Sequence, residues 1–234
     1  IPLRLVGSEM CIRDSSETIS SLISLEAEIF FEDGIGEGIF TSNEIFQEKG
    51  LRVASRIDCI AKSDLLISNQ PLDVEEIKLM KSGSTLLGMV NPFSNQDLIN
   101  CCAQNNINLV SMEFIPRITR AQKMDVLSSQ ANLAGYAAVI ESAKYLSTAL
   151  PMMMTAAGTL KPARVFVIGV GVAGLQAIAT AKRLGARVEA FDTRDVVEEQ
   201  VNSLGAKFVK IDLGETGQTD QGYAKELTLS LIHI

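Results

Sequence analysis

The sequence predicts an α/β protein with two Rossmann-like parallel-sheet domains joined by a long helix, both of them incomplete in this chain. Two observations support this prediction. Short apolar strands alternate with helical segments from Ala27 onward, and a glycine-rich turn follows an apolar run at 165–168. Because strands separated by single helices need crossover connections, the pattern favours parallel sheets.

The first domain is expected to span 16–124, with its start truncated. Short polar residues before the first helix, Thr41 or Ser42, would cap it by accepting free backbone N–H groups. Gly50 and Gly83 end two helices, because glycine tolerates the left-handed conformation that follows a helix. The predicted strands cover 27–31, 52–54, 65–68, 85–90 and 108–112, and the predicted helices cover 43–49, 74–81 and 95–104.

A long helix is predicted over 125–150, where apolar residues recur near helical spacing, and we expect it to link the two domains. The second domain would follow over 151–228. It contains one mononucleotide-binding half, whereas a complete dinucleotide domain has two. Its predicted strands cover 165–168, 187–191 and 207–211, and its first helix covers 175–184 and ends at Gly185.

The two ends of the chain differ from the rest. Residues 1–15 and 229–234 fit no periodic pattern and resemble translated adapter or read-through sequence. We therefore expect both segments to be non-native. Glu9, Arg13 and Asp14 interrupt any apolar stretch long enough for a signal peptide. Resequencing the gene from its source would then return different residues at both ends.

The glycine-rich turn begins after Val165-Phe-Val-Ile168, a run typical of a buried parallel strand. Gly169 permits a sharp turn, Gly171 lets the backbone approach a pyrophosphate, and Gly174 lets the next helix pack closely on the strand. The N-terminus of that helix would face the negative charge. The pattern therefore predicts a nucleotide site. The alternative, a glycine-rich turn between packed elements, leaves the position of Asp192 unexplained.

Asp192 stands at the end of the second predicted strand of this domain, where dinucleotide-binding folds place an acid. Its carboxylate would accept hydrogen bonds from both hydroxyls of an adenosine ribose. A 2'-phosphate would meet it as a like charge, so the acid favours NAD over NADP. Arg194 leaves the choice open, because a nearby arginine can accommodate such a phosphate.

Composition argues against several other functions. The net charge is −7, from 21 Lys and Arg against 28 Asp and Glu, and the absence of a basic cluster argues against a nucleic-acid surface. The four cysteines show neither zinc-site spacing nor a CxxC motif, which favours a reducing compartment. They are Cys11, Cys59, Cys101 and Cys102.

Two apolar stretches do not predict membrane spans. The stretch at 165–181 contains three glycines and Gln176 and follows the strand-then-helix pattern above. The stretch at 150–154 is too short to cross a bilayer, and we interpret it as a methionine-lined packing segment.

Several motifs together resemble the NAD(H)-binding domain of the alpha subunit of proton-translocating NAD(P) transhydrogenase. The first is Arg-Ile-Thr-Arg-Ala-Gln at 117–122, within a matching segment at 116–136. The second is Met-Met-Met-Thr-Ala-Ala-Gly at 152–158, leading into the glycine turn. Phe-Asp-Thr-Arg at 191–194 and Gly-Tyr-Ala-Lys-Glu at 222–226 follow in the order of that family. The resemblance covers 16–228.

The resemblance implies a set of site residues. Arg117, Gln122 and Asp125 would form a loop beside the nicotinamide ring, with Ser128 on the carboxamide. Arg117 and Asp125 could pair to hold the loop, leaving Gln122 to bridge towards a second nucleotide. Tyr223 would lie on a mobile loop that closes over the cofactor. The remaining cofactor-binding residues would be Gly169, Gly171, Val172, Ala173, Gly174, Asp192, Thr193 and Arg194.

The family loop also has a local interpretation. Thr119 as a helix cap and Asp125 as a first-turn acid would account for the same residues by helix-start chemistry alone.

The resemblance further implies direct, Re/Si-specific hydride transfer from NADH bound here to NADP+ on a partner domain, coupled to proton translocation. The partners would be an NADP(H)-binding domain or beta subunit and a membrane proton-channel domain, with the chain itself in a homodimer. We expect the cytoplasmic face of a bacterial inner membrane, or the mitochondrial matrix side in a eukaryote. The fragment alone would be inactive.

Such a reaction suits the residues present, because hydride exchange between two nicotinamides moves no hydroxyl proton and depends on positioning. The single histidine is His233, in the suspect tail. The closest rival function is an alanine dehydrogenase, but where that family carries its catalytic histidine this chain has Met89-Val-Asn-Pro92. A third possibility is a noncatalytic NAD-binding fragment.

Overall fold

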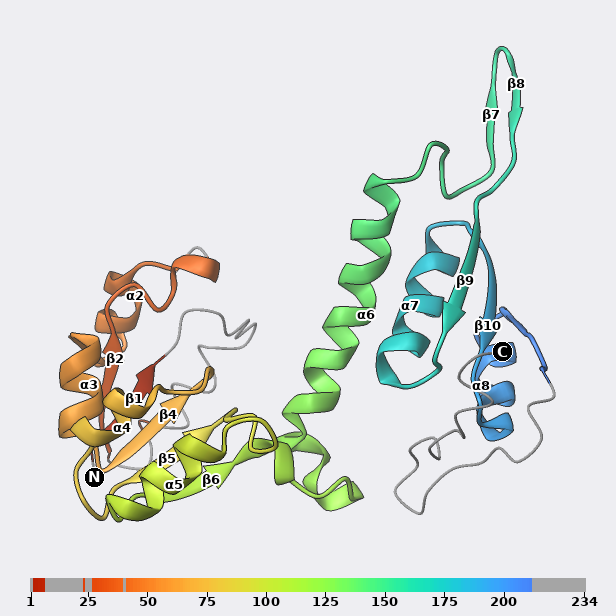
Figure 1. Cartoon of the computed structure of the whole chain (residues 1–234). Helices are drawn as coiled ribbons and strands as arrows, with labels where there is room; N and C mark the ends of the chain where they lie inside the picture. Colours follow the sequence, from red (N-terminus) through yellow and green to blue (C-terminus); the bar gives the residue numbers. More distant parts are fainter. Residues whose placement is uncertain (1, 7–22, 24–26, 40, 212–234) are drawn as a thin grey trace. The chain divides into compact units, whose positions relative to one another are not determined.

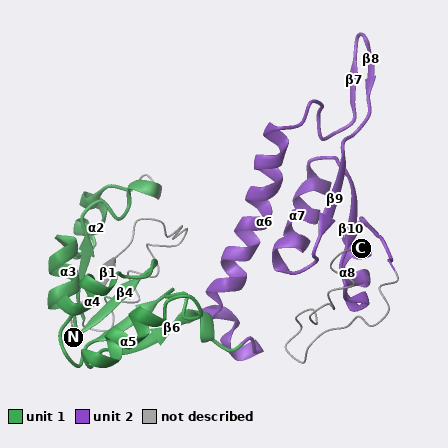
Figure 2. Ribbon diagram, in the orientation of Figure 1, with its two compact units in different colours: residues 1–116 green, residues 117–234 purple. Residues whose placement is uncertain are grey.

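The computed structural model describes residues 2–6, 23, 27–39 and 41–211. The chain divides into two compact units, residues 1–116 and residues 117–234, shown in Figure 2. From the sequence, the first domain was predicted to end near residue 124 and the following helix was predicted to link the two domains. The structure instead assigns that helix to the second unit.

Unit 1 is built on a parallel sheet of six strands, labelled in Figure 1. Every pair of neighbouring strands is parallel, and the strand order is that of a doubly wound nucleotide-binding fold. From one edge to the other the strands are β3 (Arg52–Ala54), β2 (Glu28–Glu32), β1 (Pro2–Val6), β4 (Leu65–Ser68), β5 (Thr85–Gly88) and β6 (Asn108–Ser111).

The strand β1 differs from the sequence-based expectation. Residues 1–15 were expected to lie outside the fold, yet Pro2–Val6 pair with both β2 and β4 near the middle of the sheet. The alternation of Leu3, Arg4 and Leu5 is the strand signal that the sequence interpretation passed over. That these residues are non-native stays a prediction, which resequencing of the gene would test.

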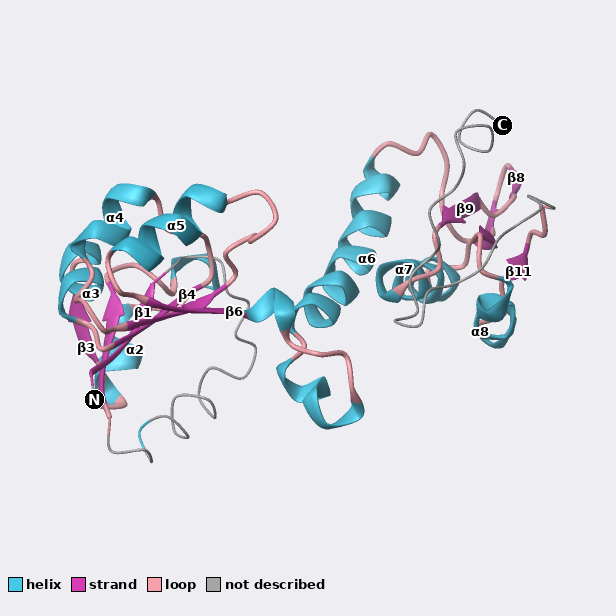
Figure 3. Ribbon diagram, turned by 60° about the horizontal axis from the view of Figure 1, so that its bottom comes forward, coloured by secondary structure: helices cyan, strands magenta, loops and turns pink. Residues whose placement is uncertain are grey.

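The helices of unit 1 connect the parallel strands, and α3, α4 and α5 pack side by side along one face of the sheet, as Figure 3 shows. Asp73 begins α4 with a capping box: it accepts from the Glu76 N–H at 2.9 Å, and Glu76 accepts from the Asp73 N–H at 3.1 Å. The helices are η1 (Glu37–Ile39), α2 (Asn43–Glu48), α3 (Arg56–Lys62), α4 (Val74–Leu79), α5 (Gln96–Gln104) and η2 (Met112–Phe114).

Helix α3 was not predicted from the sequence. Its only buried apolar side chains are Cys59 and Ile60, too few to reveal a helical period. Ser55 marks its start, accepting a hydrogen bond from the Asp58 N–H at 3.1 Å, and this cap was the available signal.

The interior of unit 1 holds two apolar clusters, one between the sheet and the faces of α3, α4 and α5, the other around Phe31 and Phe46. Cys59, Cys101 and Cys102 belong to the larger cluster, and all three side chains are buried. Burial raises the pKa of the Cys102 thiol, because a thiolate is poorly solvated there.

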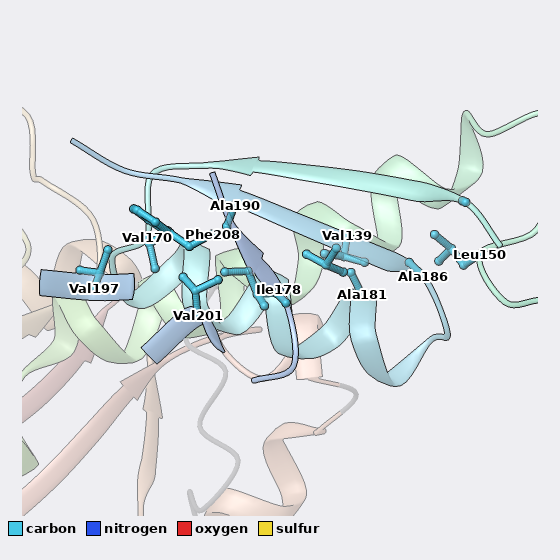
Figure 4. Packing of buried hydrophobic residues seen from close by; sticks show 13 residues of the cluster. Val139, Leu150, Val170, Ile178, Ala181, Ala186, Ala190, Val197, Val201 and Phe208 are labelled. Carbon is cyan, nitrogen blue, oxygen red and sulfur yellow. The ribbon is translucent and has the colours of Figure 1, made fainter. Parts of the chain in front are cut away.

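Unit 2 contains a parallel three-stranded sheet ordered β11–β10–β9. The long helix α6 packs along α7, which in turn lies on the sheet. Figure 4 shows the core between them, where Val139 of α6, Ile178 of α7 and Ala190 of β10 are buried. The elements are η3 (Thr119–Met124), α6 (Val126–Lys144), β9 (Arg164–Ile168), α7 (Val172–Arg183), β10 (Arg187–Phe191), η4 (Asp195–Val197), α8 (Glu198–Ser203) and β11 (Lys207–Phe208).

A hairpin precedes β9 and was not predicted. Its strands β7 (Met153–Thr155) and β8 (Gly158–Leu160) are antiparallel. The methionines at 152–154 were expected to pack inside the protein, and this is wrong: they are 61%, 45% and 83% exposed. Short strands of this kind carry no sequence period that separates them from a packing segment.

Candidate nucleotide-binding site

The turn between β9 and α7 has the conformation that its glycines predicted. Gly169 has φ of +89°, in the left-handed region where glycine is favoured, so the chain reverses sharply after the strand. The Gly169 N–H donates to the Phe191 carbonyl at 2.8 Å, which fixes the turn against the end of β10. The turn is therefore attached to the carboxyl end of the neighbouring strand.

The other two glycines differ in their surroundings. A Cβ atom built on Gly174 would lie 1.9 Å from the Gly169 carbonyl oxygen, so only glycine fits where α7 approaches the strand. A Cβ atom on Gly171 would meet nothing within 4 Å, so Gly171 faces open space. Gly171 is also the N-cap of the 12-residue helix α7 and supplies no capping side chain. The first-turn N–H groups near Val172 and Ala173 thus suit an anionic ligand.

Asp192 stands beside this turn at the carboxyl end of β10 and is 9% exposed. One carboxylate oxygen accepts from the Val170 N–H at 2.7 Å and the other from the Arg194 N–H at 2.8 Å. The Arg194 guanidinium donates to both oxygens at 2.8 Å. The sequence expected this carboxylate to face a ribose, and in the structure its acceptor positions are taken by the protein.

The charges of Asp192 and Arg194 stabilise each other. Burial of the carboxyl opposes ionisation, but the hydrogen bonds from Arg194 and the Val170 N–H outweigh it and hold the pKa of Asp192 below its usual value. The same carboxylate raises the pKa of Arg194. Each group therefore favours the ionised form of the other.

A second cluster of expected residues lies at the start of α6. Asp125 is the N-cap of this helix and accepts from the Ser128 N–H at 2.9 Å and the Ser128 hydroxyl at 2.6 Å. The Ser128 hydroxyl bond, the Ser128 N–H and the charge of Arg117 lower the pKa of Asp125. Gln122 is exposed on the preceding η3. Asp125 thus does helix-start chemistry, as an N-cap rather than as a first-turn acid, while Thr119 begins η3 and caps nothing in α6.

Helix α6 connects the two clusters. Its residue Gly135 packs against Ala173 in the first turn of α7. Asp125 comes ten residues earlier, which places it about 15 Å further along the helix axis. The sequence interpretation missed two residues of this arrangement: Gly135, for which a glycine inside a helix was the only signal, and Val170, whose backbone contacts both Asp192 and Arg194.

Some expected features lie outside the described residues, namely Tyr223, the loop around it and the tail 229–234. Among residues 2–6, 23, 27–39 and 41–211, no cluster of His, Cys, Asp and Glu side chains is arranged to hold a metal ion. Within the same residues, no helix combines the length and hydropathy that crossing a membrane requires.

Family models match both halves of the chain. The alanine dehydrogenase/PNT N-terminal domain matches residues 14–134, and the alanine dehydrogenase/PNT C-terminal domain matches residues 138–230. An NAD(P) transhydrogenase subunit alpha chain of Rhodospirillum rubrum is 45% identical over 235 residues, covering 97% of this chain and 61% of the relative.

Solved structures agree with the sequence matches. The crystal structure of transhydrogenase from Sinorhizobium meliloti superposes with a TM-score of 0.83 at 43% identity, covering 91% of this chain and 62% of that one. An L-alanine dehydrogenase gives 0.74 at 18% identity, covering 89% and 60%, which shows a shared fold. The chain thus spans about three fifths of the length of these relatives.

These matches confirm the predicted Rossmann-like parallel α/β fold and the predicted family resemblance. With one family model covering more than half of its residues and a second covering most of the rest, the chain belongs to the alanine dehydrogenase/PNT family.

Proposed function

We propose that this chain is the NAD(H)-binding part of a proton-translocating NAD(P) transhydrogenase. The observation that supports this most strongly is the β9–α7 turn, with an uncapped helix N-terminus, an open Gly171 and the acid Asp192 beside it. The relatives with 43–45% identity are named transhydrogenases, which favours this function over amino-acid oxidation.

The chain would hold NAD(H) along the edge formed by the turn. The backbone of Gly169, Gly171, Val172, Ala173 and Gly174 would bind the pyrophosphate through the start of α7. The adenosine ribose would lie at the end of β10, where Asp192, Thr193 and Arg194 meet. The nicotinamide would then lie towards the start of α6, beside Ser128, with Tyr223 closing over it.

At the nicotinamide end of the site, near the start of α6, the chain would position the nicotinamide ring and would transfer no proton. Asp125 and Ser128 form one hydrogen-bonded unit, and Arg117 contributes charge to it. Gln122 is exposed and offers both a donor and an acceptor, so it can bridge to a second nucleotide presented by another domain. Direct hydride transfer, Re/Si-specific, would need only close approach of the two rings and exclusion of water.

The proposed partners follow from the same reaction. NADP(H) would be bound on a separate domain or beta subunit, and a membrane proton-channel domain would couple transfer to proton movement. We propose that the chain acts as a homodimer on the cytoplasmic face of a bacterial inner membrane, or on the matrix side in a eukaryote. Without the partner domain, the chain would bind NAD(H) but transfer no hydride.

Isotope transfer tests the proposal. The full-length protein and its NADP(H)-binding partner are mixed with NADP+ and with NADH that carries deuterium at both C4 positions, and the products are analysed by mass spectrometry. We expect deuterium in NADPH and none in water. Consumption of NADH only with pyruvate and ammonia would instead indicate an alanine dehydrogenase, and cofactor binding without transfer would indicate a noncatalytic module.

A further inference from the structure

The Arg194 guanidinium donates two hydrogen bonds to the Asp192 carboxylate, and this two-bond pair occupies the acceptor positions that a ribose would use. A carboxylate offers about four acceptor positions. Here the protein supplies four donors: the Val170 N–H, the Arg194 N–H, and Nε and Nη2 of Arg194. Ribose hydroxyls can therefore bond to Asp192 only if some of these donors withdraw.

Arg194 is the donor that can yield a position. Because its side chain donates to both oxygens, it can give up one bond to a ribose hydroxyl and stay on the carboxylate through the other. The two backbone N–H groups are fixed by the turn and by the strand end, whereas the guanidinium is at the end of a flexible side chain. It is also held by a hydrogen bond from Nη2 to the Val170 carbonyl at 3.2 Å. The side chains of Arg194 and Asp192 are 14% and 6% exposed, so the pair is largely shielded from solvent.

The ion pair weakens the expectation that Asp192 excludes NADP by repelling its 2'-phosphate. While the guanidinium neutralises Asp192, a 2'-phosphate meets little net negative charge there. Discrimination then depends on whether Arg194 is committed to the carboxylate. A guanidinium released from Asp192 would be a bidentate donor for phosphate at the same position.

From this geometry we infer that Arg194 determines which nucleotide binds: Asp192 holds it away from the 2'-position, and a released Arg194 would bind the 2'-phosphate of NADP(H). The inference rests on the proposed function, because it assigns the adenosine end of the same site.

Asp192→Asn tests it. The amide keeps its oxygen for the Val170 N–H and turns its NH2 group, itself a donor, towards the guanidinium, so both bonds from the Arg194 side chain to residue 192 are lost. We expect this variant to bind NADPH about tenfold or more tighter than the wild type does, because the hydrogen bonds between the Arg194 guanidinium and the 2'-phosphate are charge-assisted. We expect it to bind NADH more weakly, because the ribose loses the carboxylate. Calorimetric titration of the full-length protein with each nucleotide measures both constants.

Two double variants of equal net charge distinguish a gain that depends on Arg194 from one that depends only on removal of the carboxylate. Asp192→Asn with Arg194→Gln should lose the gain in NADPH affinity. Asp192→Asn with Arg187→Gln should keep it, because Arg187 is exposed at the opposite end of β10. Circular dichroism checks folding, and Asp192→Ser replaces Asp192→Asn if the amide variant does not fold.

The outcomes are distinct. A gain that survives in both double variants would show that removing the carboxylate suffices, which overturns the role of Arg194. An Asp192→Asn protein that binds NADH but no more NADPH than the wild type also overturns it. A wild-type protein that binds no NADH removes the proposed function and this inference with it.

Discussion

Gly135 of α6 lies so close to α7 that a Cβ atom built on it would be 2.1 Å from the carbonyl oxygen of Ala173 and 3.0 Å from its Cα. The contacted atoms are backbone, so they cannot move aside as a flexible side chain would. The helix that begins at Asp125 is thereby fixed against the first turn of α7. One glycine thus sets the spacing between the two clusters of the candidate site.

We predict that Gly135→Ala destabilises unit 2. In an unconstrained helix the same change stabilises by about 1 kcal/mol through helix propensity. Here the new methyl group must push α6 from α7, so the sign should reverse, with a loss on the order of 1–3 kcal/mol. Chemical denaturation followed by circular dichroism measures it. An increase in stability would show that the two helices separate freely.

Gly174→Ala and Gly171→Ala should have different effects, the first on stability and the second on NADH affinity. The first places a Cβ atom 1.9 Å from the Gly169 carbonyl oxygen and should lower the melting temperature. The second meets nothing within 4 Å at a φ of −84°, so no clash arises and any loss of stability should be limited to the poorer helix capping by alanine. NADH affinity should nevertheless fall in Gly171→Ala, because the methyl group lies where the pyrophosphate would approach. Calorimetry and NADH titration of both variants test this contrast.

The Asp192 carboxylate should make folding sensitive to acid. Its pKa is lowered in the folded state, so its contribution to stability is complete above the unfolded value, about 3.9, and is lost as pH falls through the folded value below that. Asp192→Asn should therefore be less stable than the wild type near neutral pH, and the gap should narrow below about pH 4. Urea unfolding over this range measures it. A gap independent of pH would contradict the assignment.

Gln122→Ala should reduce hydride transfer more than it reduces NADH affinity. The side chain is exposed, so the free energy of unfolding should change by no more than about 0.5 kcal/mol. Steady-state transfer rates and NADH titration on the same preparation give the two effects. Gln47→Ala on the exposed face of α2 is a matched control that should change neither. Equal losses of rate and affinity would argue against the bridging role.

Much of the fold could be predicted because its signals are local. The strands at 52–54, 65–68 and 187–191 were predicted to the residue, since each is a short run bounded by turn or cap residues. The turn geometry of Gly169 and the close packing of Gly174 were also predictable, because both follow from backbone demands within one turn.

Two of the features that were not predicted are contacts that depend on distant segments. The packing of α6 on α7 depends on what Gly135 meets, which no helical period reveals. The two-bond pair of Arg194 and Asp192 joins residues only two apart, yet it closes because the Val170 backbone, far away in sequence, orients both. The predicted roles of Arg117, Gln122, Ser128 and Tyr223 towards a cofactor stay predictions.

The placement of sulfur in the fold has a practical consequence. All the cysteines of the chain precede residue 103, so unit 2 has none, and Cys59, Cys101 and Cys102 are closed within the apolar interior of unit 1. Cys59 and Cys102 are 0% and 2% exposed, so an alkylating reagent can reach their sulfur atoms only when that interior opens transiently. The labelling kinetics of Cys59 and Cys102, followed separately by peptide mass spectrometry, therefore report the opening of unit 1, and ligand effects on unit 2 can be compared with them without introducing another cysteine.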